Sequence, residues 1–246
     1  MYRTIASLQN DLVKHLVRLR QNNDYRLNCK TVIIEGIKPV RELCQTITPK
    51  CVIAVDEHLV PPGIHPESVV IVPEDILHKI SGMLTPEGLI AEFPMPHFDS
   101  LHGMKRIIAL DNVRDPGNLG SLFRTALALG WEGAFLIGEN CDPYNEKALR
   151  AARGATFRLP HIHGSWEQLQ NLIRLNKMNP LIADLGGVPL TAIDREEPIL
   201  LLLSNEAHGA SPEGKKVCQQ VTIPLLGEME SLNVAAAGAI LMYQLK

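Results

Sequence analysis

The stretch DNVRDPGNLGSLFRTALALG, residues 111–130, decides the fold of this chain. It continues the apolar run RIIAL at residues 106–110, which predicts a buried strand. The pattern breaks at residues 115–117, and apolar side chains then recur at helical spacing up to Leu129. We therefore expect a strand, a tight loop and a helix. The N-terminus of such a helix suits a phosphate or a carboxylate, although most junctions of this kind bind nothing.

The composition is that of an ordinary globular protein. The chain has 246 residues, of which 46% are hydrophobic and 21% charged, and its mean hydropathy is +0.03. This is enough apolar material for a core. No apolar run reaches the roughly 18 residues that cross a bilayer, and the N-terminus lacks the apolar segment of a signal peptide, so we expect a cytoplasmic protein. The five cysteines include no CxxC pair, and we expect reduced thiols and no metal site.

Basic residues gather at the N-terminus although the whole chain has a net charge of −3. Residues 1–30 hold six Lys or Arg against two Asp, a local charge of +4. Such a segment is compatible with docking to nucleic acid, and a solvated helix face is the alternative.

The first part of the chain predicts a small α/β unit. Residues 7–22 predict an amphipathic helix with Ser7 as its N-cap and with an apolar stripe made of Leu8, Leu12, Leu16 and Leu19. Short apolar runs and helical patterns then alternate through residue 83. Residues 94–103 contain prolines and glycine without periodicity, which is typical of a linker.

The second part, from Met104, predicts a larger sheet. We expect strands at about 106–112, 133–138, 158–162, 180–185, 199–204 and 221–225. Runs such as ILLLLS are apolar at every position, which indicates strands covered on both faces of a largely parallel sheet. Such sheets bind ligands at the carboxyl ends of their strands. Polar clusters follow three of the predicted strands, at residues 112–118, 205–211 and 227–233.

Taken together, these clusters resemble a known family. NVRDPGNLGSLFRTA, a strand that ends in NExxG, and IPLxGxxESLNVA, in this order, resemble the SpoU or TrmH-type RNA ribose 2′-O-methyltransferases over about residues 104–246. The segment before them, residues 1–95, resembles the ribosomal-protein-like substrate-binding domain of many such enzymes. The resemblance implies an α/β fold whose C-terminal, mostly parallel sheet forms a deep trefoil knot. It also implies S-adenosylmethionine held in the knot and a homodimer with the active site near its interface.

The resemblance also implies roles for individual residues. The positions that match catalytic residues of the family are Asn118, Arg124, Glu206, Ser231 and Asn233. The positions that match its cofactor site are Ser204, Asn205, Glu206, Gly209, Ile223, Leu225, Leu232 and Asn233. The candidates for contact with RNA are Arg18, Arg20, Arg26, Arg114 and Arg150. The resemblance also implies that Arg124 could act as a base for the 2′-hydroxyl. Because a guanidinium is a very poor base, we expect Arg124 mainly to hold a phosphate and stabilise a developing alkoxide.

The expected function is methyl transfer from S-adenosylmethionine to a ribose 2′-hydroxyl in RNA, without a metal. Ribosomal RNA is the first choice, because of the N-terminal segment, and transfer RNA is the alternative. A non-catalytic RNA-binding protein is a further alternative, since Ser204 and Ala207 stand where the family most often has glycine. A dehydrogenase is poorly supported, because the spacing of Gly117 and Gly120 is not that of GxGxxG.

Overall fold

The computed structural model describes residues 2–204, 209, 211–225, 227–228 and 230–246. The chain forms two compact units. The first comprises residues 1–96 together with Tyr144–Arg150, and the second comprises His97–Pro143 and Ala151–Lys246. No helix in the described part of the chain is both long enough and apolar enough to cross a membrane.

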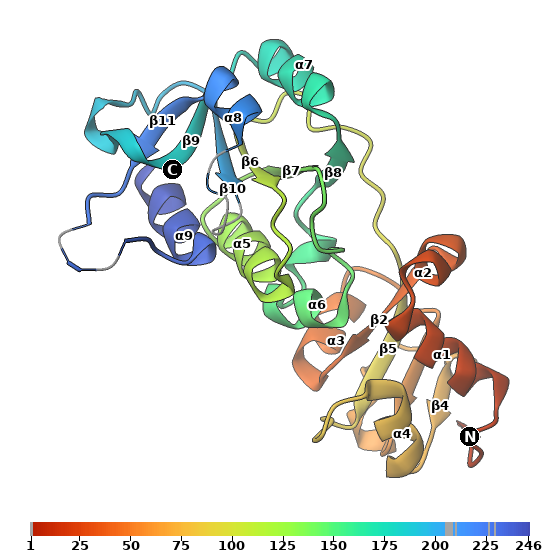
Figure 1. Cartoon of the computed structure of the whole chain (residues 1–246). Coiled ribbons are helices and arrows are strands. Elements are labelled where there is room, and N and C mark those ends of the chain that lie inside the picture. Colours follow the sequence, from red (N-terminus) through yellow and green to blue (C-terminus); the bar gives the residue numbers. More distant parts are fainter. Residues whose placement is uncertain (1, 205–208, 210, 226, 229) are drawn as a thin grey trace. The chain divides into compact units, whose positions relative to one another are not determined.

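The first unit contains a mixed five-stranded sheet in the order β1-β4-β3-β5-β2 (Figure 1). Its strands are β1 (Arg3–Thr4), β2 (Thr31–Glu35), β3 (Cys51–Ala54), β4 (Val69–Ile71) and β5 (Leu89–Pro94). Strands β1, β4 and β3 are parallel to one another, whereas β5 runs antiparallel to both of its neighbours. The α-helices of this unit are α1 (Asp11–Gln21), α2 (Asn23–Cys29), α3 (Ile37–Cys44), α4 (Glu74–Ser81) and α6 (Glu146–Ala152), the last grouping with it up to Arg150. Two 3₁₀ turns join them, η1 (Glu57–Leu59) and η2 (Pro66–Ser68).

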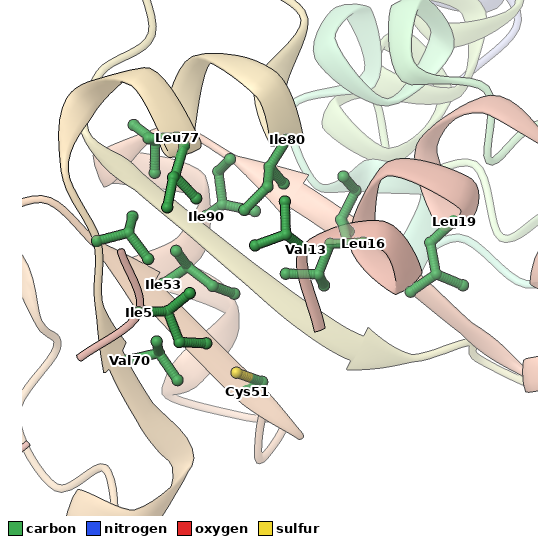
Figure 2. Packing of buried hydrophobic residues seen from close by; sticks show 13 residues of the cluster. Ile5, Val13, Leu16, Leu19, Cys51, Ile53, Val70, Leu77, Ile80 and Ile90 are labelled. Carbon is green, nitrogen blue, oxygen red and sulfur yellow. The ribbon is translucent and has the colours of Figure 1, made fainter. Parts of the chain in front are cut away.

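Helix α1 packs against α4 and one face of this sheet. Figure 2 shows Val13, Leu16 and Leu19 of α1 directed into the core that also contains Ile80 and Ile90. All of these side chains are at most 2% exposed. Burying a side chain of this size contributes about 1.5–3 kcal/mol, so this apolar stripe is what docks the helix.

The predicted start of α1 is wrong. Asn10 is the N-cap, because its Oδ1 accepts a hydrogen bond of 2.9 Å from the Leu12 N–H. The Ser7 hydroxyl accepts instead from the N–H of Gln9, within a turn that precedes the helix. Leu8 therefore lies outside the buried stripe and is 44% exposed. Val13, which we did not predict in the stripe, is buried in it.

The second unit contains a six-stranded sheet in the order β11-β9-β10-β6-β7-β8, in which every pairing is parallel. Its strands are β6 (Arg106–Asp111), β7 (Gly133–Ile137), β8 (His161–Gly164), β9 (Asn179–Pro189), β10 (Ile199–Ser204) and β11 (Gln219–Thr222). The predicted α/β fold with a parallel sheet is confirmed. Strand β8 begins later than predicted because a 3₁₀ turn, η3 (Ala155–Phe157), and Pro160 precede it.

Helices cover both faces of this sheet. They are α5 (Pro116–Ala128), α7 (Trp166–Asn176), α8 (Pro212–Val217) and α9 (Val234–Gln244), with a 3₁₀ turn η4 (Leu190–Ala192). Alternate residues of β10 face opposite sides. Leu202 joins the core that also contains residues of α7 and α8, whereas Leu203 faces α9. A Cβ on Gly238 of α9 would lie only 2.8 Å from Leu203, so the glycine allows α9 to approach the sheet closely.

The C-terminal helix is held from two directions. The Trp131 indole N–H donates to the carbonyl of Met242 at 3.2 Å, and Arg106 Nε donates to the carbonyl of Leu245 at 3.1 Å. Arg106 Nη1 also donates to the carbonyl of Glu197 at 2.8 Å. The start of β6 therefore anchors the end of α9. The trefoil knot that the resemblance implies stays a prediction.

Candidate functional site

The loop after β6 is built around Asn112, which has φ 58°. Asparagine tolerates this left-handed conformation better than most residues. Its Nδ2 donates to Asp111 Oδ1 at 2.6 Å, and its Oδ1 accepts from the Glu139 N–H at 2.9 Å. The second bond joins the exits of β6 and β7, so Asn112 fixes the shape of the loop.

The helix N-terminus that follows is already capped. Asp115 is the N-cap of α5, and its Oδ1 accepts from the Asn118 N–H at 2.7 Å. Pro116 stands at the first helical position, which needs no N–H donor. A carboxylate of the chain therefore occupies the place where we predicted that an external anion could bind. Asn118 lies in the first turn of α5.

The sequence analysis missed Asn140, which joins the same loops. Its Oδ1 accepts from the Val113 N–H at 2.8 Å, and its Nδ2 donates to the carbonyls of Leu110 and Ile137 at 3.0 and 2.8 Å. The signal that could have revealed it is an asparagine directly after the predicted strand at 133–138. These bonds hold the loop between β6 and α5, which leads to Asn118, in one conformation.

Two of the predicted catalytic residues meet in space. Asn233 is the N-cap of α9, and its Oδ1 accepts from the N–H groups of Ala235 and Ala236 at 3.0 and 3.3 Å. Its Nδ2 donates to Asn118 Oδ1 at 2.9 Å, across 115 residues of sequence. Asn233 is therefore both a helix cap and a partner of Asn118. The first and third polar clusters form one site.

A cavity of about 230 Å³ opens beside α9, at the carboxyl end of β10 and along the middle of β9. Six of the predicted cofactor-site and catalytic residues line it, namely Ser204, Gly209, Ile223, Leu225, Ser231 and Leu232. Asn233 is not part of the lining, but its neighbours Leu232 and Val234 are. Asn205 and Glu206, like Ala207, lie outside the described residues.

Four polar side chains, those of Asp184, Ser204, Thr222 and Ser231, interrupt the mainly apolar wall, and two of them bear on ligand binding. The Ser204 Oγ is buried and has no hydrogen-bond partner among the described residues. An unpaired buried hydroxyl is costly, and a bound ligand would remove that cost. The second polar residue, Asp184 of β9, was missed by the sequence analysis. Its position at the end of a predicted strand was the available signal.

Asp184 is held by two donors. Lys215 Nζ lies 2.8 Å from its Oδ2, and the Gly186 N–H donates to its Oδ1 at 3.0 Å. The hydrogen bond from Lys215, followed by that from Gly186, lowers the pKa of the Asp184 carboxyl below its ordinary value. The cavity therefore presents a fixed, ionised carboxylate.

Arg124 of α5 is exposed, and no described residue forms an ion pair or hydrogen bond with its guanidinium. The other predicted arginines differ in this respect. Arg114 pairs with Glu139 at 2.6 Å, and Arg150 lies 3.9 Å from Glu146. Both remain at least 38% exposed at the side chain.

The basic N-terminal segment is less available than its sequence indicates. Arg18 is exposed, with its guanidinium 4.1 Å from the centre of the Tyr25 ring. The Arg20 side chain is 14% exposed and pairs with Glu146 at 3.4 Å. Arg26 is only 4% exposed, and its Nη1 donates to the carbonyls of Leu19 and Arg20. Arg26 therefore caps the end of α1 and does not offer its charge to RNA.

No group of three or more His, Cys, Asp or Glu side chains converges on a possible metal position in the part of the chain that the structure describes.

Family models match both units of the chain. The model described as the SpoU rRNA Methylase family matches residues 105–243. The chain belongs to the SpoU rRNA methylase family. A second model, described as an MRM3-like substrate binding domain, matches residues 10–91. The resemblance stated from the three polar clusters is thus confirmed.

Relatives of known activity match most or nearly all of this chain. The 23S rRNA (guanosine(2553)-2′-O)-methyltransferase RlmP of Bacillus subtilis is 30% identical, with 98% of both chains covered. A 23S rRNA (uridine(2479)-2′-O)-methyltransferase of Streptomyces viridochromogenes is 28% identical over 63% of this chain and 58% of its own. Among solved structures, an AdoMet-bound rRNA methyltransferase from Sinorhizobium meliloti has a TM-score of 0.87 and 28% identity, covering 99% of this chain and 97% of its own.

Proposed function

We propose that this protein transfers the methyl group of S-adenosylmethionine to a ribose 2′-hydroxyl of ribosomal RNA. Residues 104–246 form the methyltransferase domain, and residues 1–95 form the domain that holds the RNA. The observation that carries the proposal is the hydrogen bond between Asn233 and Asn118, which places two polar clusters of the family beside one cavity. Membership of the SpoU family supports the same activity.

The cavity fits the adenosine part of such a cofactor. Its walls are largely aliphatic, from β9, β10 and α9, and they suit a flat apolar base. The buried Ser204 hydroxyl has no described partner and would gain one from the ligand. Ile223, Leu225 and Leu232 would contact the base, and Gly209 and Ser204 would lie along the nucleoside. S-adenosylmethionine, when bound, supplies a methyl group on a positively charged sulfur.

Asn118, Asn233 and Arg124 act on the RNA side of the reaction. The ribose 2′-oxygen would attack the methyl carbon in line, the bond from that carbon to sulfur would break to release S-adenosylhomocysteine, and the hydroxyl proton would pass to solvent water. Fixed placement therefore matters more than a strong base. The Asn233 amide holds the Asn118 amide in one orientation. The exposed Arg124 guanidinium holds the adjoining phosphate and stabilises negative charge on the attacking oxygen. Glu206, Asn205 and Ser231 complete the active site in this proposal.

The first unit favours ribosomal RNA over transfer RNA. The B. subtilis relative, whose name specifies 23S rRNA, matches this chain across both units. Arg18, stacked on Tyr25, presents an exposed charge for phosphate contact in this unit. Arg20 and Arg150, beside Glu146, contribute further positive charge for the RNA, and Arg114 contributes charge from the second unit.

In this proposal the methyl transfer takes place in the cytoplasm and requires no metal.

The exposed face of α9 supports a homodimer. Ile240 is 41% exposed and Tyr243 is 57% exposed, three residues apart on a helix that is apolar on nearly all sides. A second copy of the chain would cover this face and place its own groups near the Asn118 loop. The proposed active site therefore lies near a dimer interface.

The test uses the purified protein, radiolabelled S-adenosylmethionine, and either 23S rRNA or total transfer RNA made in cells that lack the gene. We expect label only in the 23S rRNA, at a single 2′-O position. Label in transfer RNA alone would overturn the choice of substrate. No detectable cofactor binding at millimolar concentration would instead favour a non-catalytic RNA-binding protein.

A further inference from the structure

We infer that Asp184 positions the cofactor by accepting hydrogen bonds from the two neighbouring hydroxyls of its ribose. This inference rests on the proposed function, because it takes S-adenosylmethionine as the ligand of the cavity. It assigns a role to a side chain that is outside the three polar clusters. Three features support this role: the place of Asp184 in the cavity, its bonds to Lys215 and Gly186, and the unpaired Ser204 hydroxyl in the same cavity.

Asp184 and Ser204 line the same cavity from neighbouring strands. The regular pairing of β9 with β10 ends at Ile182, and the register of β9 against β11 shifts between Ile182 and Val188, so Asp184 lies in a bulge of β9. Strand β10 separates this bulge from β6, the strand that leads to Asn118. Asp184 is therefore suited to a part of the cofactor away from the reacting methyl group.

The charge of Asp184 is already balanced, which favours neutral donors. Lys215 Nζ lies 2.8 Å from Oδ2 and supplies the opposite charge. A ligand ammonium would therefore meet a neutral pair and gain little, whereas a hydroxyl needs only a free lone pair. Each carboxylate oxygen accepts about two hydrogen bonds. Lys215 occupies one position on Oδ2 and the Gly186 N–H occupies one on Oδ1, so one position remains on each oxygen. Two adjacent hydroxyls match this arrangement.

The turn that carries Asp184 is fixed before any ligand binds. The Gly186 N–H donates to Oδ1 of Asp184, which closes a short turn. A Cβ on Gly187 would lie 2.5 Å from the backbone nitrogen of Val221, so β9 and β11 are in close contact at this point. A side chain held in this way loses little conformational freedom on binding, which increases affinity.

Ser204 supplies the second, independent observation. Its buried hydroxyl has no partner among the described residues, and it lines the same cavity next to Asp184. Aliphatic side chains, including Leu203 and Val221, surround the two polar groups. A ligand that fills this space must be mainly apolar and yet carry polar groups along one edge. A nucleoside has this character, with its base against the aliphatic wall and its ribose beside Asp184.

The test compares ligands that keep or lack each part of the cofactor. Asp184→Asn keeps the size of the side chain, and Glu213→Gln on the exposed surface of α8 is the matched control. Calorimetry measures the binding of S-adenosylhomocysteine, of 5′-methylthioadenosine, which lacks the amino-acid end, and of its 2′,3′-dideoxy form. Thermal unfolding of each variant checks that it is folded.

We expect Asp184→Asn to weaken the binding of S-adenosylhomocysteine and methylthioadenosine equally, by about ten-fold to a hundred-fold, and Glu213→Gln to change neither. The dideoxy ligand should bind the wild type and Asp184→Asn with the same affinity, an equality that a purely structural role would not produce. Loss of S-adenosylhomocysteine binding alone would place Asp184 at the amino-acid end and overturn the inference. Normal binding of both ligands by Asp184→Asn would also overturn it and leave the proposed function standing. Failure of the wild type to bind either ligand would refute both.

Discussion

Replacing Asn233 with Asp tests whether its bond to Asn118 serves catalysis or only stability. The substitution keeps the oxygen that accepts from the Ala235 and Ala236 N–H groups, and Asp is as good an N-cap as Asn. It removes only the Nδ2 donor that lies 2.9 Å from Asn118 Oδ1. Two oxygen atoms then face each other, so the Asn118 amide must turn over or move away.

The size of the effect follows from these contacts. A hydrogen bond between neutral, partly solvated side chains contributes about 0.5–1.5 kcal/mol, and that is the expected loss of folding free energy for Asn233→Asp. Asn233→Ala removes the cap as well, which lowers the folding free energy by about a further 0.5–2 kcal/mol. A displacement of about 1 Å in a catalytic group can lower a rate about a hundred-fold, so we expect a loss of this order in kcat/KM for both variants.

The assay combines urea unfolding with single-turnover methyl transfer to 23S rRNA. Asn233→Asp should remain nearly as stable as the wild type and yet lose most of its activity. Asn118→Ala should be similarly inactive, and the double variant should be no worse than either single one. Full activity of Asn233→Asp would refute the positioning role, and additive losses in the double variant would show that the two amides act independently.

Other parts of the structure make three further predictions. Arg124→Ala should lower methyl transfer about a hundred-fold or more while S-adenosylhomocysteine affinity stays the same; equal loss of both would assign Arg124 to the cofactor. Burial lowers the pKa of His161, so only the unfolded state takes up a proton as the pH falls below about 6.5, and the free energy of unfolding should decrease there. In His161→Asn this decrease should become smaller, whereas in the exposed control His163→Asn it should not; equal slopes in urea titrations from pH 8 to pH 5 would contradict the assignment. Ile240→Glu should convert the dimer into monomers in light scattering; a monomeric wild type would remove the proposed interface.

Much of the fold was predictable because its signals are local. The five residues from Ile199 to Leu203 are apolar in the sequence and fully buried in the structure, as a central parallel strand requires. The junction from β6 to α5 was predictable for the same reason, since Asp115 and Pro116 are a typical helix start. The start of α1 was mistaken because Ser7 and Asn10 are both good N-caps, and local sequence does not decide between them.

The site was only partly predictable. The motifs pointed to Asn118, Asn233 and the cavity residues, because the family resemblance preserves residue identity. The sequence could not reveal that Arg26 is buried and binds the carbonyl groups at the end of α1. A basic residue has the same sequence signal whether it holds a helix end or contacts RNA. Asp184 was missed because it owes its place in the cavity to an irregular part of β9, which no short motif encodes.

By itself, the sequence determined the strands of the larger sheet, the start of α5 and the family of this protein, since each depends on residues close together in the chain or on recognisable motifs. Only the tertiary structure decided that the Asn233 amide meets Asn118, 115 residues away, and that Asp184 lines the same cavity as the unpaired Ser204 hydroxyl. The physical reason is that a parallel sheet brings together the ends of strands that are distant in sequence. The loop at residues 111–118 is readable as a local motif, but its chemistry depends on what α9 places next to it.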